Sequence, residues 1–560
     1  MNALLILFCL SLSAQAQESN GAADRAAEAQ ELYAKNQWPG IAQSAAPAAD
    51  GPAELDLNRG LALAHLGKLE EAKACFESGL LKSPRDKRFL IELAGVAFQQ
   101  KDSSRAKHFL KRALELDPHD AYVLDFLATL YFLDGNLEAA LQYWNRIGKP
   151  EIANVRLEPQ PEIRAALLDR AFAFSPLAVL RLEDLRTSEA RVQNLEVFPR
   201  FQFVLNPSGE DKYEVTFRGA ERNGWGDGKL DALVSLLRGL PYETLYPQYA
   251  NLGHSAINLD GLARWDDQKR RLFAEFATPL RGDPSWRLRF FFDGRNENWD
   301  MRGTFHAATS GMPGLNLEKE EAGFEIRRVE SGRWTWQTGA SFAHRNFRNV
   351  TGVAPAGQAL FTNGLSLEYR GKVDYRLMEN AVKRMRLDSS VGAQVGRMFA
   401  RPLGNFAKVQ GSLAWHWFPR ATGEDYEMTS RFRAGSILGS APFDEIYMLG
   451  LERDNDLWLR GTVGTEKGMK GSAPMGRRYV LWNWEGDKVI YRQAFFTIRA
   501  GPFVDVGRIT DPSGNFASSG WRWDPGIECK VRVLGSVEVV FFFGRDLRAG
   551  RNAFYATALQ

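Results

Sequence analysis

The chain has 560 residues, which is too long for one ordinary domain, and its formal net charge is only +3. This weak charge does not mark a nucleic-acid binder, so we expect no nucleic-acid partner. Three cysteines in such a length exclude a disulfide framework. No uninterrupted apolar stretch approaches the ~20 residues that a spanning helix needs, so a membrane segment of the mature chain must be a strand.

The N-terminus predicts export. The segment Met1–Gln17 carries no charged side chain, and its run Leu4–Leu10 is apolar. Ala14-Gln15-Ala16 then provides an A-x-A cleavage site. We therefore expect residues 1–16 to be a signal peptide that is removed from the mature chain.

A 34-residue repeat occupies residues 53–150. Small residues where two helices cross, a large apolar residue four positions later and a final proline are what a stack of helix pairs needs. This pattern resembles the tetratricopeptide repeat, and it predicts a helical solenoid over residues 24–150, with a degenerate capping pair at residues 24–48. Its concave face is expected to bind a protein partner, and a plain spacer is the alternative. The repeat positions are Gly60, Ala72, Phe76 and Pro84, then Ala94, Ala106, Leu110 and Pro118, then Ala128, Ala140 and Trp144.

Residues 151–223 predict a small α+β domain. The expected order is β-α-α-β-β, with a clear hairpin turn at Asn206-Pro207-Ser208-Gly209. For the second helix, Thr187 or Ser188 is the expected cap. This order resembles the POTRA domain, the periplasmic module of the BamA-type superfamily of barrels. The expected elements are a strand at Val155–Leu157, helices at Ile163–Phe172 and Ser188–Leu195, and strands at Phe201–Leu205 and Tyr213–Phe217.

From residue 224 to the C-terminus, apolar residues alternate with polar ones. Such alternation fits a soluble β-sandwich, whose charges face bulk water, and also a membrane barrel, whose charges line the lumen. The number of segments and the many aromatic residues favour a transmembrane antiparallel β-barrel of about sixteen strands over residues 224–560. One example sets Leu365, Leu367 and Tyr369 against Ser366, Glu368 and Arg370.

Motifs in this region carry a more specific resemblance. Pro442-Phe443-Asp444-Glu445, Leu449-Gly450 and Leu459-Arg460-Gly461 resemble the long loop of BamA-type barrels, which folds back into the lumen with an Arg-Gly tip. Phe503-Val504-Asp505-Val506-Gly507 resembles the F-x-D-x-G strand of that family, whose aspartate faces inward. The resemblance implies a loop latch made of Arg460, Gly461, Phe503, Asp505 and Gly507.

Two positions depart from the family pattern. Thr462 stands where the family usually has an aromatic residue after Arg-Gly. This departure is expected to weaken the docking of the loop tip. The chain ends in Leu559-Gln560 instead of a terminal Phe. This departure is expected to alter recognition by the cell's own barrel-assembly machinery.

Residue patterns for enzyme chemistry are not found. The seven histidines have no metal-binding spacing, and neither a phosphate-binding loop nor a nucleophile elbow occurs. Glu452, Asp454 and Asp456 lack the Gly and Glu positions of a calcium loop, so we expect them to be solvated acids. No catalytic residue, cofactor or metal is expected.

The resemblance implies an outer-membrane protein whose N-terminal domains lie in the periplasm. Its expected function is outer-membrane protein assembly or polypeptide translocation, with unfolded or nascent polypeptides as clients and outer-membrane lipid around the barrel. Two alternatives are a repeat-plus-barrel exporter of polysaccharide and a soluble periplasmic scaffold with a β-sandwich.

Overall fold

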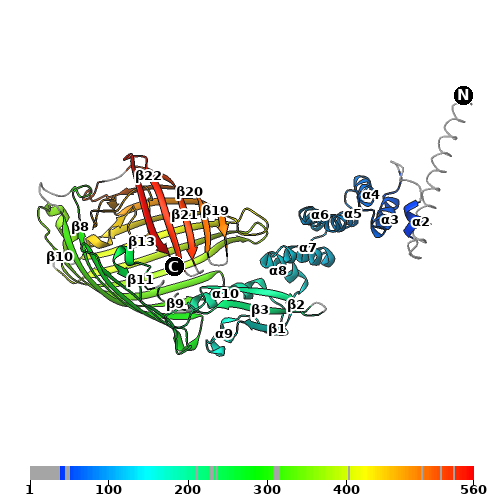
Figure 1. Ribbon diagram of the computed structural model, residues 1–560. Coiled ribbons are helices and arrows are strands. Elements are labelled where there is room, and N and C mark those ends of the chain that lie inside the picture. The colour runs from blue at the N-terminus through cyan, green and yellow to red at the C-terminus, as the bar shows by residue number, and fades with distance from the viewer. Residues whose placement is uncertain are drawn as a thin grey trace, which may run out of the picture. The chain divides into compact units, whose positions relative to one another are not determined.

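A computed structural model describes residues 38–43, 51–209, 212–226, 233, 236, 238–306, 314–400, 404–493, 496–517, 520–533 and 537–559. The chain forms two compact units, Met1–Lys149 and Pro150–Gln560, which are described separately (Figure 1). The expected signal peptide lies outside the described residues, and of the capping pair only α2 (Trp38–Gln43) is described. No described helix is both long and apolar enough to cross a membrane.

The first unit contains the predicted helix pairs. A Cβ atom on Gly60 would lie 2.4 Å from the ring of Phe76, so only glycine lets these two helices approach so closely. Ala72, Phe76, Ala106, Ala140 and Trp144 are all buried. Pro84 and Pro118 come two residues after the ends of their helices, where proline cannot interrupt a helical hydrogen bond. The helices are α3 (Ala53–His65), α4 (Leu69–Lys82), α5 (Lys87–Gln99), α6 (Ser103–Leu116), α7 (Ala121–Leu133) and α8 (Leu137–Trp144).

The two cysteines of the described residues, Cys75 and Cys529, are free. Burial raises the pKa of the Cys75 thiol, which keeps it protonated and unreactive. This agrees with the absence of a disulfide framework that the composition indicates.

The second unit begins with an α+β module in the predicted order. Its sheet has the order β1-β3-β2, in which β1 is parallel and β2 antiparallel to β3. The central strand is therefore β3, and β2 lies at an edge. Phe203 and Phe217 pack in the core of the module, with ring centroids 5.4 Å apart. The elements are β1 (Glu151–Glu158), α9 (Ala165–Ala171), α10 (Leu182–Leu195), β2 (Arg200–Pro207) and β3 (Lys212–Ala220).

The predicted start of the second helix is wrong. Helix α10 begins at Leu182, and Thr187 and Ser188 lie within it instead of capping it. Each hydroxyl donates to the carbonyl four residues earlier, at 2.7 Å in both cases. Such back-bonding satisfies these side chains inside a helix, so a hydroxyl residue does not by itself mark a helix start.

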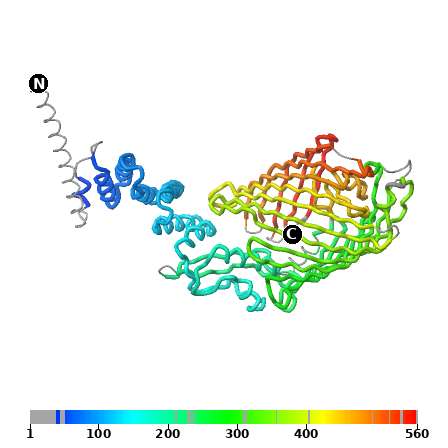
Figure 2. The backbone as a smooth tube through the Cα atoms, turned by 180° about the vertical axis from the view of Figure 1, so that it is seen from behind, coloured from blue at the N-terminus to red at the C-terminus, as the bar shows by residue number. Residues whose placement is uncertain are grey.

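The rest of the unit is a closed barrel (Figure 2), which excludes the β-sandwich. Its sheet contains eighteen strands among the described residues, against the expected sixteen. The count differs because β16 and β17, which join the sheet, belong to the loop between β14 and β19. The strands are β4 (Thr244–Leu245), β5 (Gln248–Leu252), β6 (Ile257–Trp265), β7 (Lys269–Pro279), β8 (Trp286–Trp299), β9 (Leu315–Val329), β10 (Trp334–Arg348), β11 (Gly364–Asn380), β12 (Met385–Met398), β13 (Gly404–Trp417), β14 (Tyr426–Gly439), β16 (Thr465–Glu466), β17 (Met469–Lys470), β19 (Arg478–Arg492), β20 (Phe496–Thr510), β21 (Arg522–Val533), β22 (Val537–Asp546) and β23 (Arg551–Leu559).

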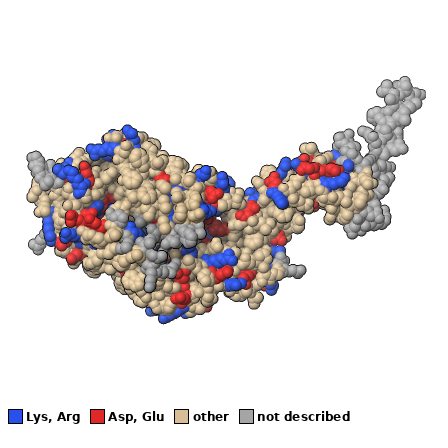
Figure 3. Space-filling model, viewed as in Figure 1, with Lys and Arg blue, Asp and Glu red and all other residues tan. Residues whose placement is uncertain are grey.

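The predicted alternation separates an apolar outer face from a polar inner face. Leu365 and Tyr369 are 43% and 54% exposed, whereas Ser366 and Glu368 between them are fully buried. On the face shown in Figure 3, much of the barrel surface carries neither basic nor acidic residues. The charged residues of the strands therefore point mainly inward, as the alternation predicted.

The α+β module packs on one end of the barrel through α10 and the residue after it. Glu196 receives hydrogen bonds from Arg287, at 3.1 Å, and from Arg289, both in β8. Arg186 pairs with Glu379 at 3.0 Å, near the end of β11. These contacts fix the module against the turns at this end of the barrel.

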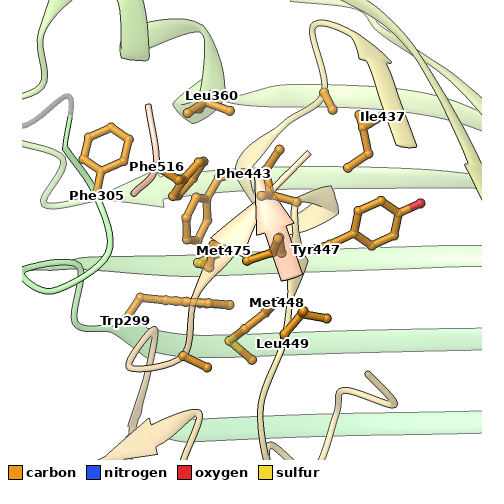
Figure 4. Packing of buried hydrophobic residues seen from close by; sticks show 14 of the residues in the cluster. Trp299, Phe305, Leu360, Ile437, Phe443, Tyr447, Met448, Leu449, Met475 and Phe516 are labelled. Carbon is orange, nitrogen blue, oxygen red and sulfur yellow. The ribbon is translucent and has the colours of Figure 1, made fainter. Parts of the chain in front are cut away.

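The other end of the barrel is filled by an apolar cluster (Figure 4). Phe443 and Tyr447, from the loop after β14, pack there with Phe305, Leu360 and Phe516 from neighbouring loops. Aromatic rings meet edge-on, for example Trp299 and Phe443 at 4.8 Å. This cluster anchors the base of the loop that carries the predicted latch.

Candidate functional site

The candidate site is the segment that connects β14 to β19, residues 440–477, which we call the inner loop. Besides β16 and β17, it contains η5 (Phe443–Glu445) and the short strands β15 (Tyr447–Met448) and β18 (Met475–Gly476), which pair with each other at its base. Leu449 and Leu459 are fully buried, and the polar side chains between them contact the inward faces of the barrel strands. The loop thus folds into the lumen, as the motifs implied.

Arg460 lies at the tip of the inner loop and binds Asp505 of β20. Its Nη2 and Nε atoms donate to the two carboxylate oxygens at 2.7 and 2.9 Å, and its backbone N–H donates to Oδ2 at 2.8 Å. The Arg460 side chain is 2% exposed and that of Asp505 0%. This is the bidentate geometry that a planar guanidinium favours with a carboxylate.

Further groups surround the Arg460 guanidinium. Its Nη1 donates to Glu485 at 2.6 Å and to Glu528 at 3.0 Å. Its central carbon lies 3.9 Å from the ring centroid of Phe503, on the same strand as Asp505. The cation is thus held by three carboxylates and an aromatic face, so that its burial is compensated.

Glycines allow the loop tip to touch the barrel wall. A Cβ on Gly461 would lie 2.4 Å from the carbonyl carbon of Arg545, in β22. A Cβ on Gly507 would lie 3.2 Å from the side chains of Leu449 and Leu459. The structure therefore brings together all five residues of the implied latch.

Thr462 does not leave the tip undocked, although the family pattern has an aromatic residue there. Its hydroxyl donates to Asp524 at 3.0 Å, and the same carboxylate oxygen accepts the Gly461 N–H at 2.8 Å. Thr462 is 7% exposed. Hydrogen bonds to Asp524 of β21 therefore dock the residue that follows the Arg-Gly tip.

A second charged cluster holds the inner loop to another part of the lumen wall, strands β6 and β7. Asp454 receives hydrogen bonds from Arg264 of β6 at 2.8 Å, from Arg271 of β7 at 2.7 Å and from Lys470 at 3.2 Å. Glu452 pairs with Lys269 at 3.4 Å. The expectation that Glu452 and Asp454 are solvated is wrong, because both side chains are at most 3% exposed. Of the three acids, Asp456 alone is solvated, at 89% side-chain exposure.

A third cluster fixes the base of the loop. Arg345 of β10 donates to Asp444 at 2.7 Å and to Glu445 at 3.0 Å, and it also binds Glu368 of β11. Lys408 of β13 pairs with Glu445 from another side at 3.4 Å. The Asp-Glu pair of the loop motif is therefore a set of ligands for basic residues in the wall.

The inner loop also spans the junction between the first and last strands of the barrel, which are neighbours in the sheet. On one side, the Arg453 guanidinium lies 3.6 Å from the ring centroid of Tyr242, just before β4. On the other side, the Trp458 ring packs against Tyr555 of β23 at 6.3 Å. The hydroxyl of Tyr242 donates to the carbonyl of Ala556 at 2.6 Å, directly across the junction.

One group of acids, Glu485, Asp487 and Glu528, has its carboxylates close enough to share a metal ion. Lys530 donates to Glu485 at 2.8 Å and to Asp487 at 2.7 Å, and Arg460 donates to Glu528. These acids thus have cationic partners, and they do not present an open set of ligands.

The sequence did not reveal the partners of the latch. Glu485, Glu528 and Asp524 lie on strands whose alternation shows only that they face inward. The second cluster joins residues 190 positions apart, and no local motif marks them. The predicted repeat residues, from Gly60 to Trp144, all lie in the first unit, whereas the latch residues lie in the second.

Comparisons with known proteins are consistent with these two parts. A family model described as "Tetratricopeptide repeat" matches residues 57–81 and 88–120. A comparison with curated protein sequences gives no match.

Solved structures similar to this chain include the following three. CdiB from Escherichia coli has a TM-score of 0.47 and 14% identity, over 74% of this chain and 77% of that chain. BamA from Haemophilus ducreyi lacking POTRA domains 1–3 has a TM-score of 0.43 and 11% identity, over 73% of this chain and 84% of that chain. CdiB from Acinetobacter baumannii has a TM-score of 0.41 and 13% identity, over 73% of each chain. The chain thus contains tetratricopeptide repeats, followed by a unit similar to solved BamA and CdiB barrels.

Proposed function

We propose that the barrel of the second unit lies in the outer membrane, with the first unit and the α+β module in the periplasm. The support is the distribution of side chains. Large apolar residues such as Phe290, Phe342 and Ile527 are 50%, 56% and 63% exposed on the outer face. In water such a continuous apolar surface is unfavourable, whereas in a bilayer it is solvated by lipid.

We infer that the barrel assembles or translocates polypeptide. The observation that carries this proposal is the inner loop, which is bound through Arg460, Asp454 and Asp444 to three parts of the lumen wall. An open pore for small solutes needs no such plug. The buried ion pairs favour the docked loop, and a client that displaces the loop must leave these charges with water or with new partners.

The α+β module supplies a way to hold an extended client. Strand β2 lies at the edge of its sheet, and an extended peptide can add to such an edge through main-chain hydrogen bonds that need no particular sequence. The tetratricopeptide stack supplies a concave surface for a protein partner. Binding and folding of the client would then provide the free energy, without a nucleotide.

Export of polysaccharide is the second candidate function. The specific observation in its favour is the combination of a helical repeat arm with a barrel. The docked inner loop does not favour it, since a glycan pore has no need for the Arg460 latch.

The test is to place a photo-crosslinking residue at Gln202 of β2 in the full chain and to identify the adducts by mass spectrometry after membrane fractionation. We expect a heat-modifiable outer-membrane protein with polypeptide adducts. Glycan adducts alone, or a chain that fractionates as a soluble protein, would contradict the proposal.

The control position is Asn154 of β1, at the other edge of the same sheet. That edge is partly covered by the chain itself, since the Ile152 N–H donates to the carbonyl of Ala178 at 2.9 Å. A crosslinker at Asn154 should therefore capture much less client than one at Gln202.

A further inference from the structure

Two cavities in the barrel interior, among the described residues, differ in their charge balance. The first has a volume of about 390 Å³, and its lining includes six basic and six acidic residues. The second has a volume of about 560 Å³, and its lining includes seven basic residues but only three acidic ones. We call the second cavity the arginine chamber. It is bounded by Ala190 and Gln193 of α10, by strands β9 to β14, and by Asp456 and Leu457 of the inner loop.

All three acids of the arginine chamber already have basic partners. Asp374 pairs with Lys372 at 2.9 Å, and Asp456 pairs with Arg433 at 3.4 Å. Asp388 is shared between Arg376 and Arg386, at 3.1 and 2.9 Å. No acid of the lining is left to compensate a further cation.

Three arginines of the chamber, Arg327, Arg333 and Arg431, have no carboxylate within ion-pair distance in the part of the chain that the structure describes. The Nε atom of Arg327 is also buried without a hydrogen-bond partner. Charges of one sign that share a partly enclosed space of low dielectric constant raise the local concentration of counter-ions. The chamber is therefore suited to an anionic ligand, whereas the balanced cavity is not.

The walls of the chamber leave room for an extended chain. Ser390 and Ser412 contribute hydroxyl groups, and Gly392 contributes no side chain. Arginine forks bind carboxylates with paired hydrogen bonds. We propose that the arginine chamber binds carboxylate-rich segments of extended polypeptide between α10 and the inner loop. This inference rests on the proposed function, since it assumes that the barrel receives polypeptide.

The test uses the full chain in lipid nanodiscs and three fluorescent probes of equal length: a Glu/Gly peptide, a Gln/Gly peptide and an oligogalacturonate. Binding is followed by fluorescence anisotropy at several salt concentrations. The variant carries Arg327→Gln, Arg333→Gln and Arg431→Gln. The matched control carries Arg270→Gln, Arg478→Gln and Arg508→Gln, three exposed arginines outside the chamber.

We expect the Glu/Gly peptide to bind more tightly than the Gln/Gly peptide. The chamber variant should weaken this binding by at least about tenfold, because it removes several charge-assisted contacts. The control variant should retain it, and salt should weaken it in the wild type. Heat-modifiable gel mobility verifies folding, and Arg431→Gln alone, at an exposed side chain, replaces the triple variant if that variant does not fold.

Two outcomes overturn the proposal in distinguishable ways. If the two peptides bind equally and the chamber variant has no effect, the chamber is not a carboxylate site, while the proposed handling of polypeptide remains. If oligogalacturonate binds with arginine dependence and neither peptide binds, both the chamber's polypeptide ligand and the proposed function are wrong.

Discussion

Arg460 and Asp505, 45 residues apart in the sequence, are joined by hydrogen bonds from the guanidinium and from the backbone N–H of Arg460 to one buried carboxylate. This pairing holds the tip of the inner loop against β20. Because both side chains are almost fully buried, each charge depends on the other for the loss of its hydration. The pair therefore couples the docking of the inner loop to the folded barrel wall.

Exchange of these charges tests whether the pair is coupled. Arg460→Glu and Asp505→Arg should each destabilise the folded barrel by up to ~3–5 kcal/mol, reduced by lumen water, because a buried charge is left uncompensated. The double exchange should restore part of the loss. Unfolding in denaturant, followed by gel mobility, measures the cycle. Arg478→Glu, at an exposed position, serves as the control, and a cycle without coupling would refute the latch.

Gly461 tests the close approach of the loop tip. A Cβ at this position would meet the backbone of β22 at 2.4 to 2.5 Å, so Gly461→Ala should displace the tip and weaken the latch. Increased protease sensitivity of residues 440–477 in the folded barrel would report this displacement. Gly371→Ala, where a Cβ meets nothing within 4 Å, should leave the protease pattern unchanged. Equal patterns for both variants would show that the tip does not depend on this contact.

The two faces of the barrel should tolerate charge differently. Phe541 is 38% exposed on the outer face, and Phe541→Arg should cost ~2–4 kcal/mol near the bilayer midplane. Thr497 lies on the same face of β20 as Arg499 and Asp505, so Thr497→Arg should be much milder. Equilibrium folding into lipid vesicles at increasing denaturant concentration measures the change in folding free energy of both variants. Equal effects would contradict a lipid-facing outer surface.

Proline substitutions in β2 test the peptide-binding edge. The N–H groups of successive residues point alternately to the two sides of a strand, so one of Phe201→Pro and Gln202→Pro removes a donor from the free edge. That variant should reduce client crosslinking, followed here from a photo-crosslinking residue at Val204, while the barrel stays folded. Glu214→Pro, in the central strand β3, should instead disrupt the sheet. If neither β2 variant changes crosslinking, the module only joins the repeats to the barrel.

Much of the fold follows from the period of the sequence. Gly60 and Phe76 mark helix crossings because only a glycine fits against that ring, and the alternation around Glu368 gives the inner face directly. The alternation also predicted that the Asp505 side chain faces the lumen, independently of the family motif. By contrast, the start of α10 could not be predicted. The hydroxyls of Thr187 and Ser188 donate to carbonyls four residues earlier within the helix instead of capping it.

The contacts of the inner loop could be predicted only at its tip. Asp454 meets Arg264 and Arg271 because the loop crosses the lumen, and that path depends on how strands far apart in sequence close into a barrel. Local spacing around Asp454 contains no sign of these partners. The arginine chamber is hidden for the same reason, since Arg327 and Arg431 come together only through barrel closure.

Reconstitution of the full chain in lipid vesicles, with an unfolded outer-membrane polypeptide as client, tests the role of the latched loop in polypeptide handling. Protease protection of the client measures its insertion or passage. We expect protection with the wild-type chain, its loss with Arg460→Glu, and partial recovery when Asp505→Arg is added. Protection that is absent in the wild type, or that is unchanged by Arg460→Glu, would contradict this role.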